Sequence, residues 1–302
     1  MISFKDIELT DKEWVKPLLA ISDFRGTEYC FTSLYMWSSI YHTKIARIED
    51  LFLIRSETQD SFSYLYPAGK GDIKMAMERM MEDAQSCNKE FTMSSITPQQ
   101  REEIERLFPG KFEFTPIRNS FDYIYLRESL ATLSGKKYQP KRNFISRFKE
   151  LPNWEYETIS SKDPILCKQQ LEECYRMNEQ WCQMSQCNHN SSKSQECCAV
   201  RKVLKDFIGL NLEGGLLRVD GQVIAYTIGE PLNSDTYIVH IEKAFADIKG
   251  AYPMINQSFI LDRTDGFQYI NREDDAGDEG LRKAKLSYNP VFMVEKYFAI
   301  PK

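Results

Sequence analysis

Carboxylates with basic neighbours occur at two places in the C-terminal half of the sequence, and both suit proton transfer. Glu242 ends a predicted strand, and His240 lies two residues earlier on the same face of that strand. A carboxylate in this position can face a cleft and act as a general base. An ion pair between Glu242 and Lys243, or another basic side chain, is the structural alternative.

The second place is a glycine-bearing loop that carries Glu273 and Asp274 directly after Arg272. Loops that hold charge on a rigid scaffold are frequent in active sites. On the predicted helix that follows, Arg282 and Lys285 lie three residues apart and share one face, where they can contact a phosphate. An internal network of ion pairs that fixes the loop to the helix is the alternative for this block.

Two further segments suit the binding of an anionic group. Lys249-Gly250-Ala251-Tyr252 separates a predicted strand from a predicted helix, so its backbone N–H groups can bind a phosphate. The alternative is that Gly250 only makes a tight turn. The run from Lys136 to Lys149 contains no Asp or Glu, and it is either a phosphate-binding surface or a solvated helix face.

Neither a metal site nor a nucleotide-hydrolysis motif is predicted. A cluster of possible ligands contains no C-x-x-C pair, which argues against zinc. The sequence also lacks a Walker-type phosphate loop, G-x-G-x-x-G and G-x-S-x-G, so dinucleotide redox chemistry and serine hydrolysis are unsupported. The cluster consists of Cys182, Cys187, His189, Cys197 and Cys198.

Length and composition favour a two-domain cytoplasmic protein. The 302 residues suit two domains, and a formal net charge of -5 argues against a protein that coats nucleic acid through its overall field. Charged residues occupy the N-terminus where a signal peptide needs an apolar stretch, and no window approaches roughly 18 uncharged apolar residues. Eight cysteines without small-scaffold spacing are expected to be reduced thiols in a cytoplasm.

Periodicity predicts the same order of elements in both halves, hairpin, strand, helix, strand, helix and strand, which suggests duplication. The expected class is α+β, with two mixed, mainly antiparallel sheets flanked by helices. A single boundary after residue 135 gives domains 1–135 and 136–302. In the first half we expect helices at 11–20 (capped by Thr10), 72–81 and 98–108, a hairpin at 44–55, and strands at 61–66, 91–93 and 121–126. In the second half we expect helices at 138–149, 164–184, 193–210, 251–262 and 280–287, a hairpin at 214–229 around Asp220-Gly221, and strands at 154–158, 235–242, 268–270 and 291–298.

Two stretches resemble a known family beyond periodicity. Residues 135–148 (GKKYQPKRNFISRF) and 271–290 (NREDDAGDEGLRKAKLSYNP) closely resemble signatures of the phosphatidylglycerol lysyltransferase C-terminal domain family. The segments 240–244 (HIEKA) and 248–256 (IKGAYPMIN) are also similar to it, so the likeness covers essentially the whole chain. It implies two tandem N-acyltransferase (GNAT or Nat) domains, related to Fem-type aminoacyl and peptidyl transferases. Unlike full-length lipid lysyltransferases, this sequence has no transmembrane portion.

The resemblance implies an acyl- or aminoacyltransferase that acts on an amine. The co-substrate is expected to be acyl-CoA or aminoacyl-tRNA, with no tightly bound cofactor, and the acceptor a small amine, peptide or lipid headgroup. A non-catalytic ligand- or partner-binding protein that keeps the fold is the alternative, and RNA binding without chemistry is a third. The catalytic candidates are Glu242, Glu273 and Asp274. The candidates for donor binding are Lys249, Gly250, Ala251, Tyr252, Arg272, Arg282 and Lys285. The candidates for substrate or phosphate contacts are Lys137, Arg142, Asn143, His240, Asn256 and Asn271.

Overall fold

A computed structural model of the protein describes residues 2–184 and 191–302. These residues form two compact units, and each unit is discontinuous in sequence. The first comprises Met1–Tyr123, Glu273–Lys285 and Phe292–Lys302, and the second comprises Ile124–Arg272 and Leu286–Val291. The single boundary predicted after residue 135 stays a prediction about independently folding domains.

The first unit is built around a mixed sheet with the strand order β1-β2-β3-β4-β6-β15-β7, and β5 pairs with β3. The C-terminal strand β15 lies between β6 and β7 and is antiparallel to both. The strands are β1 (Lys5–Asp6), β2 (Thr43–Ile48), β3 (Leu51–Glu57), β4 (Ser61–Tyr64), β5 (Ala68–Gly69), β6 (Glu90–Ile96), β7 (Phe112–Pro116) and β15 (Tyr297–Pro301). The helices are α1 (Lys12–Ser22), α2 (Phe31–Tyr41), α3 (Ile73–Ser86), α4 (Pro98–Leu107) and most of α10 (Glu279–Leu286).

Helices with one apolar face complete the core of the first unit. The buried face of α3 carries Ala76, Met77, Met80 and Ala84, which repeat at helical spacing and join a cluster with residues of β3, β4 and β6. Asp72 caps α3, and Thr97 caps α4 in a capping box with Gln100. Local sequence signals therefore set where these helices begin.

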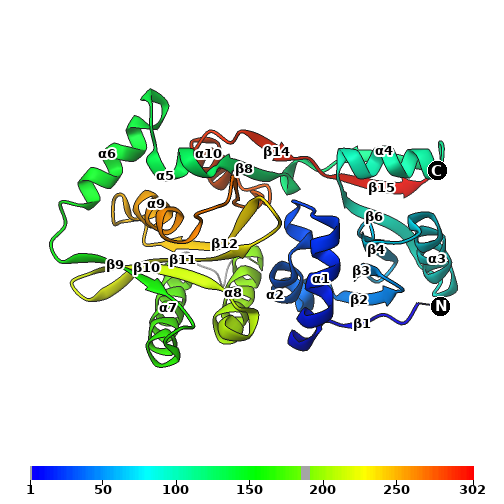
Figure 1. The fold of residues 1–302 in the computed structure, drawn as a ribbon, viewed down its shortest axis with the longest axis horizontal. Coiled ribbons are helices and arrows are strands. Elements are labelled where there is room, and N and C mark those ends of the chain that lie inside the picture. The colour runs from blue at the N-terminus through cyan, green and yellow to red at the C-terminus, as the bar shows by residue number, and fades with distance from the viewer. Residues whose placement is uncertain (1, 185–190) are drawn as a thin grey trace. The chain divides into compact units, whose positions relative to one another are not determined.

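The seven-stranded sheet has the order β14-β8-β13-β12-β11-β10-β9, and its strands β9 to β13 belong to the second unit. Its other two strands are the short β14 (Phe292–Val294) and β8 (Asp122–Leu126). Figure 1 shows α9 on one face of the sheet and α7 with α8 on the other. Phe207 of α8 and Phe259 of α9 are fully buried. The remaining elements are α5 (Arg127–Thr132), α6 (Gln139–Phe148), β9 (Trp154–Ile159), α7 (Pro164–Met184), α8 (Ser191–Leu210), β10 (Glu213–Val219), β11 (Gln222–Pro231), β12 (Thr236–Ala244), α9 (Ala251–Arg263) and β13 (Tyr269–Asn271).

The two mixed sheets with flanking helices confirm the predicted α+β class. The hairpin at Asp220-Gly221 has positive φ at both residues (49° and 78°), as a type I′ turn requires. No helix among residues 2–184 and 191–302 combines the length and the apolar character that crossing a membrane demands.

Two local expectations were wrong, and some elements were missed. Helix α2 was missed because its aromatic-rich segment has no clear period, and strand β7 was missed although Phe112 and Phe114 alternate with polar residues. Thr10 does not cap α1, since it belongs to a 3-10 turn and Asp11 occupies the N-cap position. The strand expected at 291–298 is two strands, β14 and β15, which belong to different sheets. Lys296 lies between the two strands and is completely buried. A buried charge is costly unless it is paired, so this position must supply partners for the ammonium.

Candidate functional site

A polar cluster in the second unit brings together three of the predicted site residues. Strand β12 carries Glu242, helix α9 carries Asn256, and Arg272 follows β13 directly. The carboxylate of Glu242 accepts hydrogen bonds from Arg272 Nη2 at 2.6 Å and from Asn256 Nδ2 at 2.8 Å. The Glu242 and Arg272 side chains are only 12% and 11% exposed, so this ion pair is screened far less than a surface pair.

Asn256 has one further feature that bears on ligand binding. The residue is 2% exposed, and its Oδ1 atom is buried with no hydrogen-bond partner among the described residues. A buried polar atom without a partner is costly, typically by about 1 to 3 kcal/mol. An N–H or O–H donor that reached Asn256 Oδ1 would remove this cost.

Aromatic rings and a second cation complete the cluster. The Arg272 guanidinium lies 4.6 Å from the centroid of the Tyr288 ring and 5.6 Å from that of Tyr125. Lys141, from helix α6, lies with its Nζ atom 3.8 Å from the Tyr288 centroid and 2.6 Å from Ser287 Oγ. Burial, together with the positive charge of Arg272, lowers the pKa of Lys141 to about 8. Arg272 and Lys141 therefore both contact the Tyr288 ring, beside the single carboxylate of Glu242.

The predicted phosphate-binding turn lies at the N-terminus of α9. Gly250 has a φ of 91° and is the N-cap, and a Cβ atom there would lie 2.2 Å from the carbonyl oxygen of Phe144 in α6. The N–H of Ala251 already donates to the carbonyl of Ile248. The close approach of α6 therefore explains this glycine, and the anion-binding role of the turn stays a prediction. Lys249 is exposed and Tyr252 is half-buried.

The other predicted contacts of the second unit have mainly structural partners. His240 Nε2 lies 3.4 Å from Glu230 Oε1, and both side chains are buried. Asn271 is buried within β13. Arg142 binds the carbonyl oxygens of Leu133 and Gly135, and so ties α6 to the end of α5. Asn143 and Lys137 are exposed, and the amide of Asn143 accepts a hydrogen bond from Gln139.

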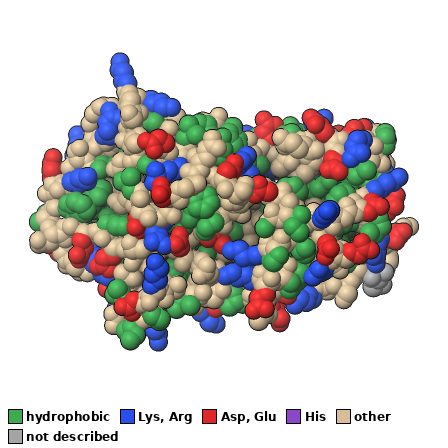
Figure 2. Space-filling view, in the orientation of Figure 1, with side chains coloured by type: hydrophobic (Ala, Val, Ile, Leu, Met, Phe, Trp, Pro, Cys, Tyr) green, Lys and Arg blue, Asp and Glu red, His purple; other side chains and the backbone are tan. Residues whose placement is uncertain are grey.

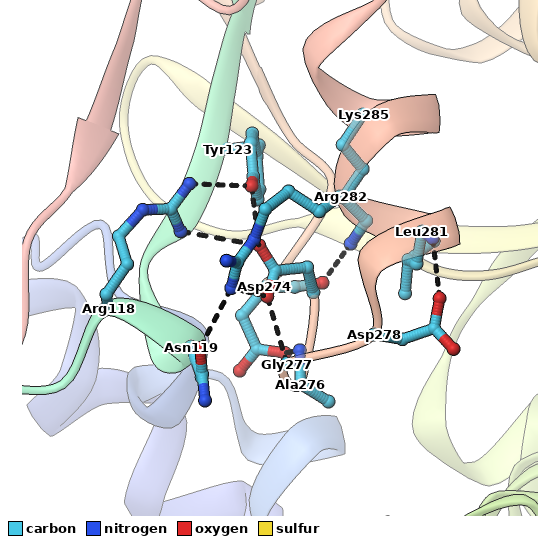
Figure 3. Close-up of polar contacts among 11 residues, drawn as sticks. Arg118, Asn119, Tyr123, Asp274, Ala276, Gly277, Asp278, Leu281, Arg282 and Lys285 are labelled. Carbon is cyan, nitrogen blue, oxygen red and sulfur yellow. Dashed lines mark hydrogen bonds and ion pairs between the residues drawn. The ribbon is translucent and has the colours of Figure 1, made fainter.

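The first unit holds a second polar cluster, centred on Asp275. Figure 3 shows its partners Arg118, Tyr123 and Arg282 close together. Its carboxylate accepts hydrogen bonds from Tyr123 Oη at 2.6 Å and from Arg282 Nε and Nη2, both at 2.9 Å, and Arg118 Nη1 lies 3.3 Å away. Burial of Asp275 opposes ionisation, but the hydrogen bonds from Arg282 and Tyr123 outweigh it and hold its pKa well below the ordinary value. This is the ion-pair network that the sequence offered as the alternative for Arg282, and Asp275 was not among the candidates.

Asp274 and Glu273 lie beside this network in the same unit. Burial raises the pKa of Asp274 to about 6 against the opposing charge of Lys296, and the charge of Asp122 adds to the rise. The Asp274 carboxylate accepts from the N–H of Ala276 at 3.0 Å, and Lys285 donates to the Asp274 carbonyl oxygen. Glu273 has a φ of 56° and accepts a hydrogen bond from Thr27 Oγ1 at 3.2 Å.

Sequence analysis missed a buried charge cluster around Lys296. The Lys296 ammonium donates to Glu28 Oε1 and to Asp122 Oδ1, both at 2.7 Å, and its side chain is fully buried. The two carboxylates hold the pKa of Lys296 above its ordinary value against the cost of burial. The charged pair Glu295-Lys296 inside the mainly apolar run FMVEKYFAI was a signal for this cluster in the sequence.

The predicted site residues therefore separate into two groups. Glu242, Asn256 and Arg272 meet in the second unit, whereas Glu273, Asp274, Arg282 and Lys285 belong to the first. Of the residues weighed as zinc ligands, Cys187 and His189 lie outside the described residues.

Comparison with known proteins gives the same fold and names a family. Residues 19–300 match the family described as phosphatidylglycerol lysyltransferase, C-terminal. A conserved protein of unknown function from Bacteroides thetaiotaomicron VPI-5482 has 40% sequence identity and a TM-score of 0.93, with 100% of each chain covered. The structure of L-PGS from Bacillus licheniformis has 13% identity and a TM-score of 0.67, covering 96% of this chain and 91% of that one.

More distant likenesses extend this picture. A tandem GNAT protein from the clavulanic acid biosynthesis pathway has 8% identity and a TM-score of 0.51, covering 100% of this chain and 98% of that one. An uncharacterised protein of Mycoplasmoides gallisepticum is 24% identical over 181 residues, 59% of this chain, and the match spans only 56% of that relative's length. The tandem GNAT-like architecture expected from the sequence is thereby confirmed.

Family and fold together describe an aminoacyl- or acyltransferase-like protein. The matched segment takes in both polar clusters and nearly the whole of each unit. The chain belongs to the phosphatidylglycerol lysyltransferase C-terminal domain family.

Proposed function

We propose that the protein transfers an aminoacyl group from aminoacyl-tRNA to an amine, and that the cluster around Glu242 is where the amine reacts. The observation that carries this proposal is the meeting of Glu242, Asn256 and Arg272 in a mostly buried polar cluster. Preorganised charges with little exposure act strongly on a reacting group, because they are poorly screened by water.

The choice of donor rests on the charge of the same unit. Lys136, Lys137, Arg147 and Lys149 are exposed on and around α6, and Figure 2 shows Lys and Arg side chains gathered at that end of the second unit. Such a surface suits a phosphate backbone. Acyl-CoA is the competing donor, and it would need the turn before α9, where the Ala251 N–H is already used.

A side-by-side binding experiment separates the donors. The purified protein is tested with aminoacyl-tRNA, uncharged tRNA and acetyl-CoA, by filter retention at two salt concentrations and by thermal shift. We expect charged tRNA to be retained in preference to uncharged tRNA, with weaker retention at higher salt. If acetyl-CoA alone stabilises the protein, the donor is acyl-CoA and not aminoacyl-tRNA. No response to any of the three ligands would refute the proposal.

The site itself is tested by substitution. We expect Glu242→Gln to lower aminoacyl transfer by about 100-fold or more, because the neutral amide no longer holds the Arg272 cation. Glu155→Gln is the matched control, since Glu155 is an exposed residue of β9 in the same unit. If Glu242→Gln transfers at the wild-type rate and its melting temperature is unchanged, Glu242 has no role in the reaction.

A further inference from the structure

Lys141 is a residue that neither the family match nor the sequence candidates single out, although it lies in the basic run of α6. Its side chain packs on Tyr288, with the Nζ atom 3.8 Å from the ring centroid. The Nζ atom donates to Ser287 Oγ at 2.6 Å. These contacts hold Lys141 against the same ring that the Arg272 guanidinium approaches at 4.6 Å, so the position of Lys141 calls for a separate explanation.

The Glu242 carboxylate is poorly placed to take a proton. One of its oxygens accepts from Arg272 and the other from Asn256, so both oxygens already serve as acceptors for donors of the protein. Charge-assisted bonds of this kind are among the strongest in proteins. The same geometry suits Glu242 to holding Arg272 in position.

We propose that Lys141, in its neutral form, accepts the proton of the attacking amine, and that Glu242 is a positioning residue that holds Arg272. This assignment rests on the function proposed above. The amine nitrogen attacks the carbonyl carbon of the activated ester, and a C–N bond forms. The amine proton passes to Lys141 Nζ. The bond between the carbonyl carbon and the ribose oxygen then breaks, and that oxygen takes the electron pair and the proton from Lys141.

Several charged and titratable groups face Lys141 and set its protonation. Arg272, next to β13, lowers its pKa and Glu242, from β12, raises it, while Tyr288 lies under the ammonium. Burial acts in the same direction as Arg272, and the outcome is a pKa of about 8. A lysine with this pKa has a substantial neutral fraction near neutral pH and still returns its proton readily, as general base catalysis requires.

Competitive labelling with trace acetic anhydride tests the proton affinity of Lys141 without any substrate. Peptide mass spectrometry at a series of pH values gives the reactivity of each lysine. We expect the reactivity of Lys141 to rise with a midpoint near pH 8, to move to higher pH in Arg272→Met and to lower pH in Glu242→Gln. Lys205, an exposed lysine of α8, is the internal control. A Lys141 midpoint equal to that of Lys205 would overturn the proposal.

The transfer assay tests the catalytic role. We expect Lys141→Arg to lower the rate by about 100-fold or more and to remove the rise in rate between pH 7 and 9, because arginine keeps the charge but does not lose its proton. Lys205→Arg should leave both the rate and the pH profile unchanged.

The outcomes separate this proposal from the proposed function. Full activity and an unchanged pH profile in Lys141→Arg would show that Lys141 is only a cationic contact, while the transferase assignment stands. If the wild-type protein transfers no aminoacyl group to any amine, the function and the role of Lys141 fail together, whatever the labelling shows.

Discussion

Asp274 illustrates how strongly burial can act on a single residue of the first unit. Its pKa is raised to about 6, from an ordinary value of 3.8, mainly because the ionised carboxylate loses hydration. A raised carboxyl pKa means that the folded protein binds this proton more tightly than the unfolded chain does. The stability from this proton is fully present below pH 3.8 and is lost as the pH rises through 6.

Replacing Asp274 by Asn should therefore stabilise the protein at neutral pH. We expect the free energy of unfolding at pH 7.5 to rise by up to about 3 kcal/mol, and the gain to vanish below pH 4, because Asn stays neutral throughout. The Asn side chain can still accept from the Ala276 N–H. Urea denaturation across pH 4 to 8 measures the difference, and Asp247→Asn, at an exposed position, is the control. A gain that does not vary with pH would show that the Asp274 carboxyl titrates normally.

The residue scale also shows which site residues a sequence can reveal. Glu242 and Arg272 were singled out as candidates because each stands next to a predicted strand with a recognisable motif around it. Lys141, Lys296 and Asp275 were not among the candidates, because their main partners lie far away in the sequence. Lys296 meets Asp122 across 174 positions, and Asp275 meets Tyr123 across 152.

At the element scale, helix α6 packs closely against the start of α9. The backbone of α6 lies so close to Gly250 that a side chain there would collide with the Phe144 carbonyl oxygen. Gly266 follows α9 and has nearly the same φ, 86° against 91°, but nothing lies within 4 Å of its missing Cβ. A side chain at Gly266 would therefore introduce backbone strain alone, whereas a side chain at Gly250 would introduce the same strain and a collision with α6.

Alanine at these two positions should give unequal losses. We expect Gly266→Ala to cost about 1 kcal/mol, from strain at positive φ, and Gly250→Ala to cost about 3 kcal/mol or more, because α6 must also move. The free energy of unfolding from chemical denaturation measures both. Equal losses would mean that α6 does not press on the start of α9, and would leave the turn free for the predicted anion-binding role.

At the scale of the whole molecule, the division of the chain into two units depends on its last strand, β15. Strand β15 lies between β6 and β7, so the sheet of the first unit is interrupted when the C-terminal residues are absent. Unpaired strand edges leave backbone N–H and C=O groups without partners and promote aggregation. The repeat of elements along the chain gave no indication of this closure.

A fragment of residues 1–135 tests the single boundary that the sequence suggested. We expect it to lack a cooperative unfolding transition, because β6 and β7 lose the strand between them. A chain in which residues 273–302 are joined to residues 1–123 by a flexible linker should recover the transition. Circular dichroism during thermal unfolding distinguishes the two. A cooperatively folded 1–135 fragment would restore the simple two-domain division.

The sequence by itself determined most helices and strands, the α+β class, the family and the identity of Glu242 and Arg272 as candidate site residues. These follow from periodicity, caps and motifs, which act over a few residues. Only the tertiary structure decided that the unit boundaries fall at four points of the chain, that Asp275 is clamped by ion pairs, and that Lys141 lies against Tyr288. The physical reason is that strand pairing and burial of charge join residues more than a hundred positions apart, and local patterns carry no record of those partners.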